Sequence, residues 1–174
     1  MIQKKNGRNG IFMEKAHVQS YGENGLDWEL NSPLLRSLDE KNQIHASKMT
    51  LTLYQHGKKS TDIYANKGIL MTENKGHEGS PPPVISKPDY GLETGDMYME
   101  GNVVVVSTDG AVLKTDWIIY KKNVDLIRST APVVVIRQDS VTKGIGLEAP
   151  SNLSNIKIFN QTVTIPDREE DQNK

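Results

Sequence analysis

The 174-residue sequence contains no cysteine and no long apolar run. Without cysteine the chain can form neither a disulfide framework nor a thiolate metal site, and it suits an oxidising or a reducing compartment equally well. A membrane-spanning helix needs roughly 18 to 20 consecutive apolar residues, and no window approaches that length. The start, MIQKKNGRNGIF, also lacks the apolar segment of a secretory signal.

The chain also lacks an excess of charge of either sign. Lys and Arg total 21 against 22 Asp and Glu, which gives a formal net charge of -1. Such a chain has no global field that would attract a phosphate backbone. We therefore expect no nucleic-acid partner.

Motifs that carry chemistry are missing as well. His17, His45, His56 and His77 have none of the spacings of a zinc motif, and no combination of serine, histidine and acid can be singled out as a triad. The glycines at 144 and 146 lack the third glycine and the following helix of a dinucleotide loop, so they predict a bend in a strand. We expect no catalytic residues, no metal, no cofactor and no enzymatic activity.

What the sequence does contain is strand pattern. Helical periodicity is nearly absent, whereas short segments with alternating apolar residues recur between turn residues. GLDWELNS and KMTLTLYQ alternate cleanly, and MYMEGNVVVVSTDG ends in the turn dipeptide Asp109-Gly110. Ten or more such strands in a chain of one-domain length predict a sandwich, barrel or roll.

The stretch LKTDWIIY, residues 113–120, changes phase in its middle. Leu113 and Thr115 are two residues apart, as are Ile118 and Tyr120, but three residues separate the pairs. IHASKMTL and IYANKGIL repeat this pattern, with Gly68 in one apolar slot of the second, and LEAPSNLS begins it. A bulge beside a small residue would let both pairs face one interior, so we predict corners of a rolled, two-layered sheet.

The positions expected to face that interior carry long or flexible apolar side chains with little polar chemistry. On the pattern alone this describes a packed core, with methionine as a gap filler. The predicted interior residues are Trp28, Leu30, Met49, Leu51, Leu53, Ile63, Met97, Met99, Leu113 and Leu126.

The order of these segments resembles the LptC family of the lipopolysaccharide export bridge. The resemblance rests on GLDWELNS, LTLYQ, IYANKGIL, the Gly101-Asn102-Val103 step, LKTDWIIY, and the segments 127–133 and 144–149. It runs from about Phe12 to Ile165, and LptA and the organic-solvent-tolerance group are related. It implies an all-β fold: a single twisted β-jelly-roll of antiparallel strands, slightly open, with an apolar interior.

The resemblance also implies a function. The interior would bind the acyl chains of lipopolysaccharide and relay the lipid from an inner-membrane ABC transporter to an LptA-like bridge protein. The protein would be periplasmic and tethered to the inner membrane by an N-terminal helix that this chain does not contain. Unpaired edge strands would join neighbouring domains. The residues expected there are Phe12, Val18 and Tyr21 in the first strand and Ile156, Ile158 and Val163 in the last.

Three segments follow from this interpretation: an N-terminal segment, residues 1–11; the β-jelly-roll domain, residues 12–165; and a charged, disordered tail, residues 166–174. The proline-rich stretch from Glu73 to Asp96 predicts an exposed loop. The alternative function is a structural adaptor whose dry, packed core only joins partners by edge-strand pairing.

Overall fold

The computed structural model describes residues 11–38, 42–73 and 91–164, and strands make up most of them. The predictions for the proline-rich stretch fall largely outside the described residues, as does the prediction of a disordered tail. The strands are β1 (Phe12–Gly22), β2 (Gly25–Leu38), β3 (Gln43–Gln55), β4 (Lys58–Met71), β5 (Met97–Ser107), β6 (Val112–Lys121), β7 (Leu126–Arg137), β8 (Ser140–Pro150), β9 (Lys157–Ile158) and β10 (Thr162–Thr164), with one 3-10 turn, η2 (Lys122–Val124).

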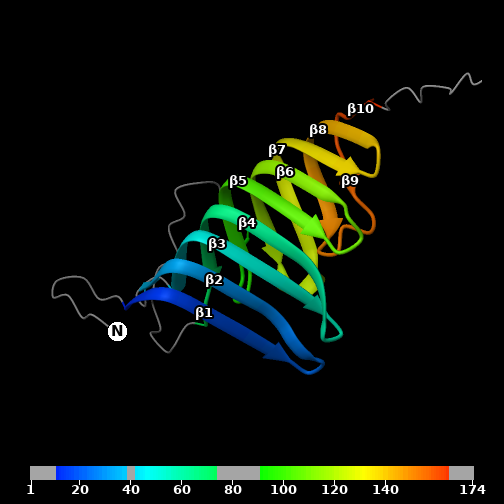
Figure 1. The fold of residues 1–174 in the computed structure, drawn as a ribbon. Helices are drawn as coiled ribbons and strands as arrows, with labels where there is room; N and C mark the ends of the chain where they lie inside the picture. Colours follow the sequence, from blue (N-terminus) through cyan, green and yellow to red (C-terminus); the bar gives the residue numbers. More distant parts are fainter. Residues whose placement is uncertain (1–10, 39–41, 74–90, 165–174) are drawn as a thin grey trace, which may run out of the picture.

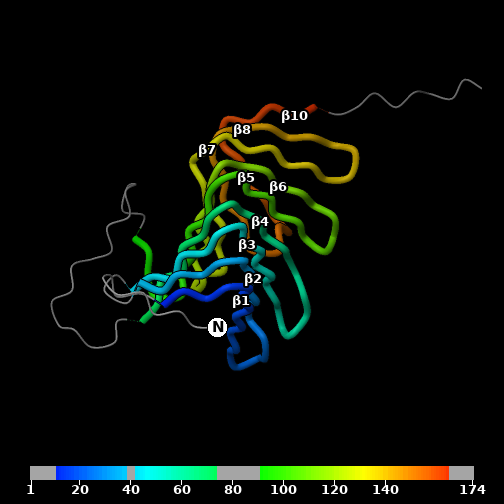
Figure 2. Tube along the Cα trace, turned by 60° about the vertical axis from the view of Figure 1, so that its left-hand side comes forward, coloured from blue at the N-terminus to red at the C-terminus, as the bar shows by residue number. Residues whose placement is uncertain are grey.

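The ten strands of the described residues belong to one antiparallel sheet, in which chain neighbours are sheet neighbours from β1 to β8. The order runs from β1 to β8 and ends with β10, while β9 also pairs with β8. Figures 1 and 2 show the strands stacked in this order, with β1 at one end and β10 at the other. The sheet does not close on itself, so the predicted all-β, slightly open roll is confirmed.

Each long strand bends near its middle, and the bends form a line across the sheet. Register shifts occur between Tyr64 and Lys67, between Glu100 and Val103, between Thr115 and Ile119, and between Ser129 and Pro132. Because the shifts lie side by side, the whole sheet folds over along this line and forms two facing walls. The phase change in LKTDWIIY is therefore a corner, as predicted.

The bend divides each long strand into two halves, one in each wall. Wall A contains residues 34–38, 43–47, 67–71, 97–100, 117–121, 126–129 and 147–150. Wall B contains residues 25–32, 49–55, 58–65, 103–107, 112–115, 132–137 and 140–145. Several segments that the sequence presents as separate short strands are thus two halves of one bent strand.

Small polar side chains satisfy the backbone groups that the corners free. The hydroxyl of Ser32 donates to the carbonyl of Ser47 at 2.7 Å, and that of Thr115 donates to the carbonyl of Pro132 at 2.9 Å. The backbone N–H of Ala131 donates to the hydroxyl of Ser129 at 3.1 Å. Buried backbone groups need partners, and these hydroxyls supply them where the ladder is broken. Of these three hydroxyl groups only that of Thr115 belongs to the repeat, so small polar residues inside and outside the repeat supply hydrogen bonds at the corners.

The fourth copy of the repeat is not a corner. Leu147 and Ala149 lie in wall A, but β8 ends at Pro150 and the chain leaves the sheet. The bend of β8 lies instead next to Gly146, whose φ of 85° falls in the left-handed region that glycine adopts without strain. The predicted strand bend at the paired glycines is therefore confirmed.

Candidate functional site

The space between the walls is apolar and contains nearly all of the predicted interior residues. Leu51, Ile63, Met99 and Leu113 have no exposed surface. Nine of the ten predicted residues belong to one buried cluster, which is continuous from β2 to the segment after β8. The nine are Trp28, Leu30, Met49, Leu51, Leu53, Ile63, Met97, Met99 and Leu113.

Leu126 is the exception, and its placement in the interior was wrong. Leu126 is only half-buried, whereas its neighbour Ile127 is fully buried within the cluster. Asp125, just before β7, has a φ of 48°, and this left-handed residue sets the phase in which the strand begins. Alternation then brings Ile127 and Ser129 inward and turns Leu126 away.

The two ends of the interior are less completely covered than its middle. At the β1 end, Met13, Ala16 and Val18 pack against the buried cluster but stay partly exposed. At the other end, Ile156 and Ile158 do the same. The apolar interior therefore reaches solvent at both ends of the stack of strands.

Both ends also carry an edge with pairing capacity. Within the described ranges, β1 pairs only with β2, and β10 and β9 pair only with β8. Of the residues predicted for these edges, Phe12, Tyr21 and Val163 are exposed, while Val18, Ile156 and Ile158 turn toward the cluster. A strand edge offers unpaired N–H and C=O groups to a further strand.

The last strand differs from its predicted form because it is split. β9 pairs with Leu147 and Glu148 in wall A, and β10 pairs with residues 141–143 in wall B. Phe159 bridges the two by exchanging backbone hydrogen bonds with Ile145 and Gly146 at 3.0 and 3.1 Å. The edge follows β8 around its bend, which a single straight strand could not do.

Polar contacts join the far ends of the two walls, opposite the corner. The carboxylate of Asp27 in wall B lies 3.3 Å from the ammonium of Lys122, which follows wall A. Gln55 in wall B donates to Asp125 at 3.2 Å. Burial raises the pKa of Tyr120, and the carboxylate of Asp125, to which its hydroxyl donates at 3.4 Å, raises that pKa further. These few contacts, most of them partly buried, span the open side of the roll.

A buried ion pair fixes the outer end of wall A. Asp96 is fully buried, and its carboxylate lies 2.5 Å from the ammonium of Lys121. It also accepts from the backbone N–H groups of Glu93 and Lys122 at 2.8 and 3.1 Å. The carboxylate is fully hydrogen-bonded, so it is a structural group. The sequence predicts Asp96 at the end of an exposed loop and gives no sign of this structural role.

Within residues 11–38, 42–73 and 91–164, no three His, Asp or Glu side chains gather as metal ligands would. In the same residues, no helix has the length and apolar character that crossing a bilayer requires.

An unclosed, folded sheet with an apolar interior and two unpaired edges defines a class of β-jelly-roll domain. A family model, "Lipopolysaccharide-assembly, LptC-related", matches residues 3–76 and 90–167. The chain therefore belongs to this family, which implies a role in lipopolysaccharide transport.

Solved structures agree on the fold. The chain is similar to LptH of Pseudomonas aeruginosa, described as the LptA-homologous periplasmic component of the conserved lipopolysaccharide transport device. The TM-score is 0.55 at 10% identity, over 80% of this chain and 95% of that chain. No curated protein is similar enough in sequence to be matched to this chain.

Proposed function

We propose that this protein binds the acyl chains of lipopolysaccharide between its two walls and relays the lipid to a neighbouring domain of the same fold. The observation that carries the proposal is the apolar interior, which runs the length of the sheet and reaches solvent at both ends. Each acyl methylene kept from water contributes about 0.8 kcal/mol, so several chains need such a shelter in an aqueous compartment.

Nearly uniform apolar walls suit movement of a lipid along the interior. Leucine, isoleucine, valine and methionine side chains offer no deep polar trap, so a chain could slide with little change in free energy. Direction then comes from an inner-membrane ABC transporter that hydrolyses ATP. The protein acts in the periplasm, tethered to the inner membrane by a helix, and performs no covalent chemistry.

The edges fit the relay because they lie where the interior opens. Pairing β1 or the β9–β10 edge with the edge of an LptA-like bridge protein would align two interiors. The interior residues would contact lipid, and Phe12, Tyr21 and Val163 would contact the partner.

One observation favours the alternative function. Leu51, Ile63 and Leu113 are fully buried by other side chains of the same protein, so the interior is filled in this state. A protein that stayed in this state would be an adaptor with a dry core that joins partners only through its edges. The two functions differ in whether the walls admit lipid.

Photocrosslinking distinguishes lipid binding between the walls from the adaptor function. A benzophenone amino acid is placed at Leu51 or Val18, which face the interior, and at the adjacent Thr50 or Gln19, which face outward. Purified protein is then irradiated with labelled lipopolysaccharide. Adducts at 51 and 18 with none at 50 and 19 support lipid binding inside the roll. Equal yields at all four positions, or none at 51 and 18, would favour the adaptor.

A further inference from the structure

The segment that follows β8 crosses the far ends of the two walls instead of joining the sheet. It contains Ser151, Asn152, Leu153 and Ser154. Leu153 is fully buried and belongs to the interior cluster although it is in no strand. Its side chain therefore occupies apolar space between the walls that no strand residue fills.

The backbone of this segment is strained. Leu153 has a φ of 56°, in the left-handed region that branched residues rarely adopt. Such conformations persist only where the surroundings hold them, and they are common in elements that switch.

A small number of polar contacts hold the segment in place. The hydroxyl of Thr61 donates to the carbonyl of Ser151 at 2.6 Å, and the amide of Asn152 donates to Gln55 at 3.3 Å. The guanidinium of Arg137 donates to the carbonyl of Leu153. Thr61 and Ser151 are buried in this state, so water can replace their hydrogen bond only once the segment has moved out.

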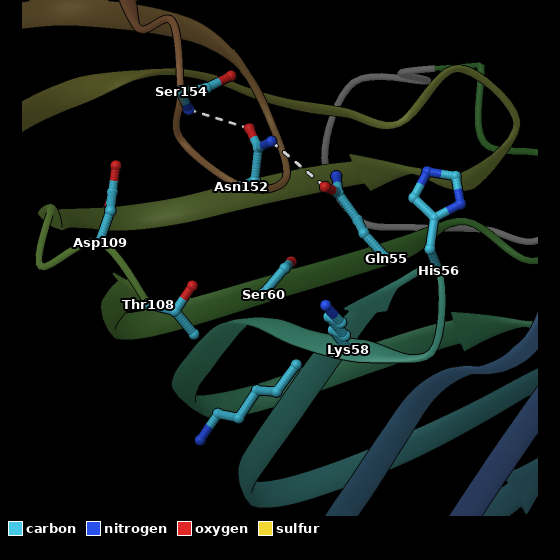
Figure 3. A pocket seen from close by; sticks show the side chains of 9 residues that line it. Gln55, His56, Lys58, Ser60, Thr108, Asp109, Asn152 and Ser154 are labelled. Atoms are coloured by element: carbon cyan, nitrogen blue, oxygen red, sulfur yellow. Dashed lines mark hydrogen bonds between the residues drawn. The ribbon is translucent and has the colours of Figure 1, made fainter.

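A polar pocket of about 450 Å³ lies directly outside this segment. Figure 3 shows Asn152 and Ser154, which flank Leu153, on one side of the pocket, and Gln55, His56 and Lys58 of the β3–β4 turn on another. Lys59 also lines the pocket, although its ammonium is 2.6 Å from Asp62. Asp109 adds one carboxylate. Lys58 and Lys59, at the start of β4, thus lie beside the segment that covers the interior at Leu153.

Wall B also contains a buried N–H donor, in the side chain of Trp28. Trp28 is 6% exposed, and its indole N–H has no hydrogen-bond partner among the residues that the structure describes. Trp28 is the cross-strand neighbour of Leu53, two residues from Gln55 on β3. The ester or amide carbonyl of an acylated lipid is an acceptor of suitable chemistry for this N–H.

We propose that Leu153 plugs an acyl-chain site, and that a lipid reaches the interior from the side by displacing residues 151–154. One acyl chain takes the space of Leu153, and the anionic phosphate of the head group lies in the pocket beside His56 and Lys58. This inference rests on the proposed function and adds a point of access and a head-group site to it.

A reversible covalent link between residues 55 and 152 tests the inference, because the 174-residue sequence contains no cysteine that would interfere. The Gln55→Cys/Asn152→Cys pair is joined by a short bis(methanethiosulfonate) and later released by reduction. The Gln19→Cys/Glu29→Cys pair, whose native side chains are hydrogen-bonded across β1 and β2 at 2.8 Å, is the matched control. Both pairs carry the benzophenone at Val18, and adduct formation with labelled lipopolysaccharide is followed over time.

The expected result is at least a tenfold slower formation of adducts with the 55–152 link, reversed by reduction, and no change with the 19–29 link. Lys58→Glu without any link is expected to slow adduct formation severalfold for bisphosphorylated lipid A and to leave dephosphorylated lipid A unaffected. Normal rates with the 55–152 link would overturn the plug while leaving the proposed function intact. Absence of adducts in the reduced, unlinked protein would overturn both.

Discussion

A Cβ atom placed on Gly68 lies 2.0 Å from the sulfur of Met49, where β3 and β4 turn the corner between the walls. The absence of a side chain at position 68 therefore makes room for Met49, a member of the interior cluster. Gly68 occupies the slot in IYANKGIL where the other complete copies of the repeat have an apolar residue. The packing of Met49 thus explains why position 68 is glycine and not an apolar residue.

Gly68→Ala is expected to lower the free energy of unfolding by about 1 to 3 kcal/mol, because overpacked cores are destabilised by that amount. Urea denaturation measures the change. In a Met49→Ala background, which empties the contested space, the same substitution should cost less than half as much. Lys67→Ala, at the exposed neighbouring position, is the control and should change stability by less than about 0.5 kcal/mol. An equal cost in both backgrounds would show that Met49 is not the obstacle.

Ile127 and Leu126 give a second comparison within one strand. Ile127→Ala should lower the free energy of unfolding by about 2 to 5 kcal/mol, because a buried side chain is removed and a cavity remains. Leu126→Ala should cost at most about 1 kcal/mol, since Leu126 is half-buried outside the cluster. Thermal denaturation of the two variants measures the difference. A larger loss of stability for Leu126→Ala than for Ile127→Ala would mean that Leu126 faces the interior, as predicted from the sequence.

These two residues also show how far sequence reasoning reaches. Where apolar and polar residues alternate, as in β3, the sequence predicts which side chains face the interior, and the structure agrees for Met49, Leu51 and Leu53. At Leu126 and Ile127 two apolar residues are adjacent, so alternation fits either phase. The left-handed backbone conformation of Asp125 decides between the two phases, and no local sequence pattern predicts that conformation.

The contacts across the open side were not predictable for a different reason. Gln55 meets Asp125 and Ser151 across 70 and 96 residues of chain, and each is an ordinary polar residue near a turn. Only the fold brings them together. Leu153 lies in a segment whose pattern resembles a corner, so its role as a buried residue outside the strands could not be recognised from the sequence.

The buried carboxylate of Asp96 makes a third prediction. Asp96→Ala removes the carboxylate that pairs with Lys121, whose ammonium keeps its hydrogen bond to the carbonyl of Gly91, and leaves two backbone N–H groups without an acceptor. The free energy of unfolding should therefore fall by about 2 to 5 kcal/mol. Asp116→Ala, at an exposed position in the corner of β6, should change it by less than about 0.5 kcal/mol. Guanidinium denaturation measures both. A small effect at 96 would mean that water reaches and solvates the site.

Asp109 predicts a pH effect. The hydroxyl of Ser107 and the backbone N–H of Ala111 donate to its carboxylate and hold its pKa below the ordinary value. Because the pKa is lower in the folded state, the hydrogen bonds to the ionised carboxylate stabilise the fold at any pH above the ordinary carboxyl pKa. This stabilisation is lost as the pH falls through the lowered pKa of Asp109. NMR titration should show the pKa of Asp109 rising toward its ordinary value in Ser107→Ala. An unchanged pKa would mean that the hydroxyl is not its main partner.

The edges make the last prediction. Val163 is 52% exposed on the terminal strand β10, so Val163→Asp should leave the free energy of unfolding within about 0.5 kcal/mol of the wild-type value. It should nevertheless weaken edge pairing with an LptA-like partner at least tenfold, because a charge on an edge strand opposes the addition of another strand. Val124→Asp is the matched control, since Val124 is 67% exposed but lies in η2, away from both edges. Titration calorimetry with the purified partner measures both variants. If Val163→Asp and Val124→Asp bind the partner equally well, pairing uses the β1 edge instead. Tyr21→Asp should then be the variant that loses the partner, because Tyr21 is 68% exposed on β1.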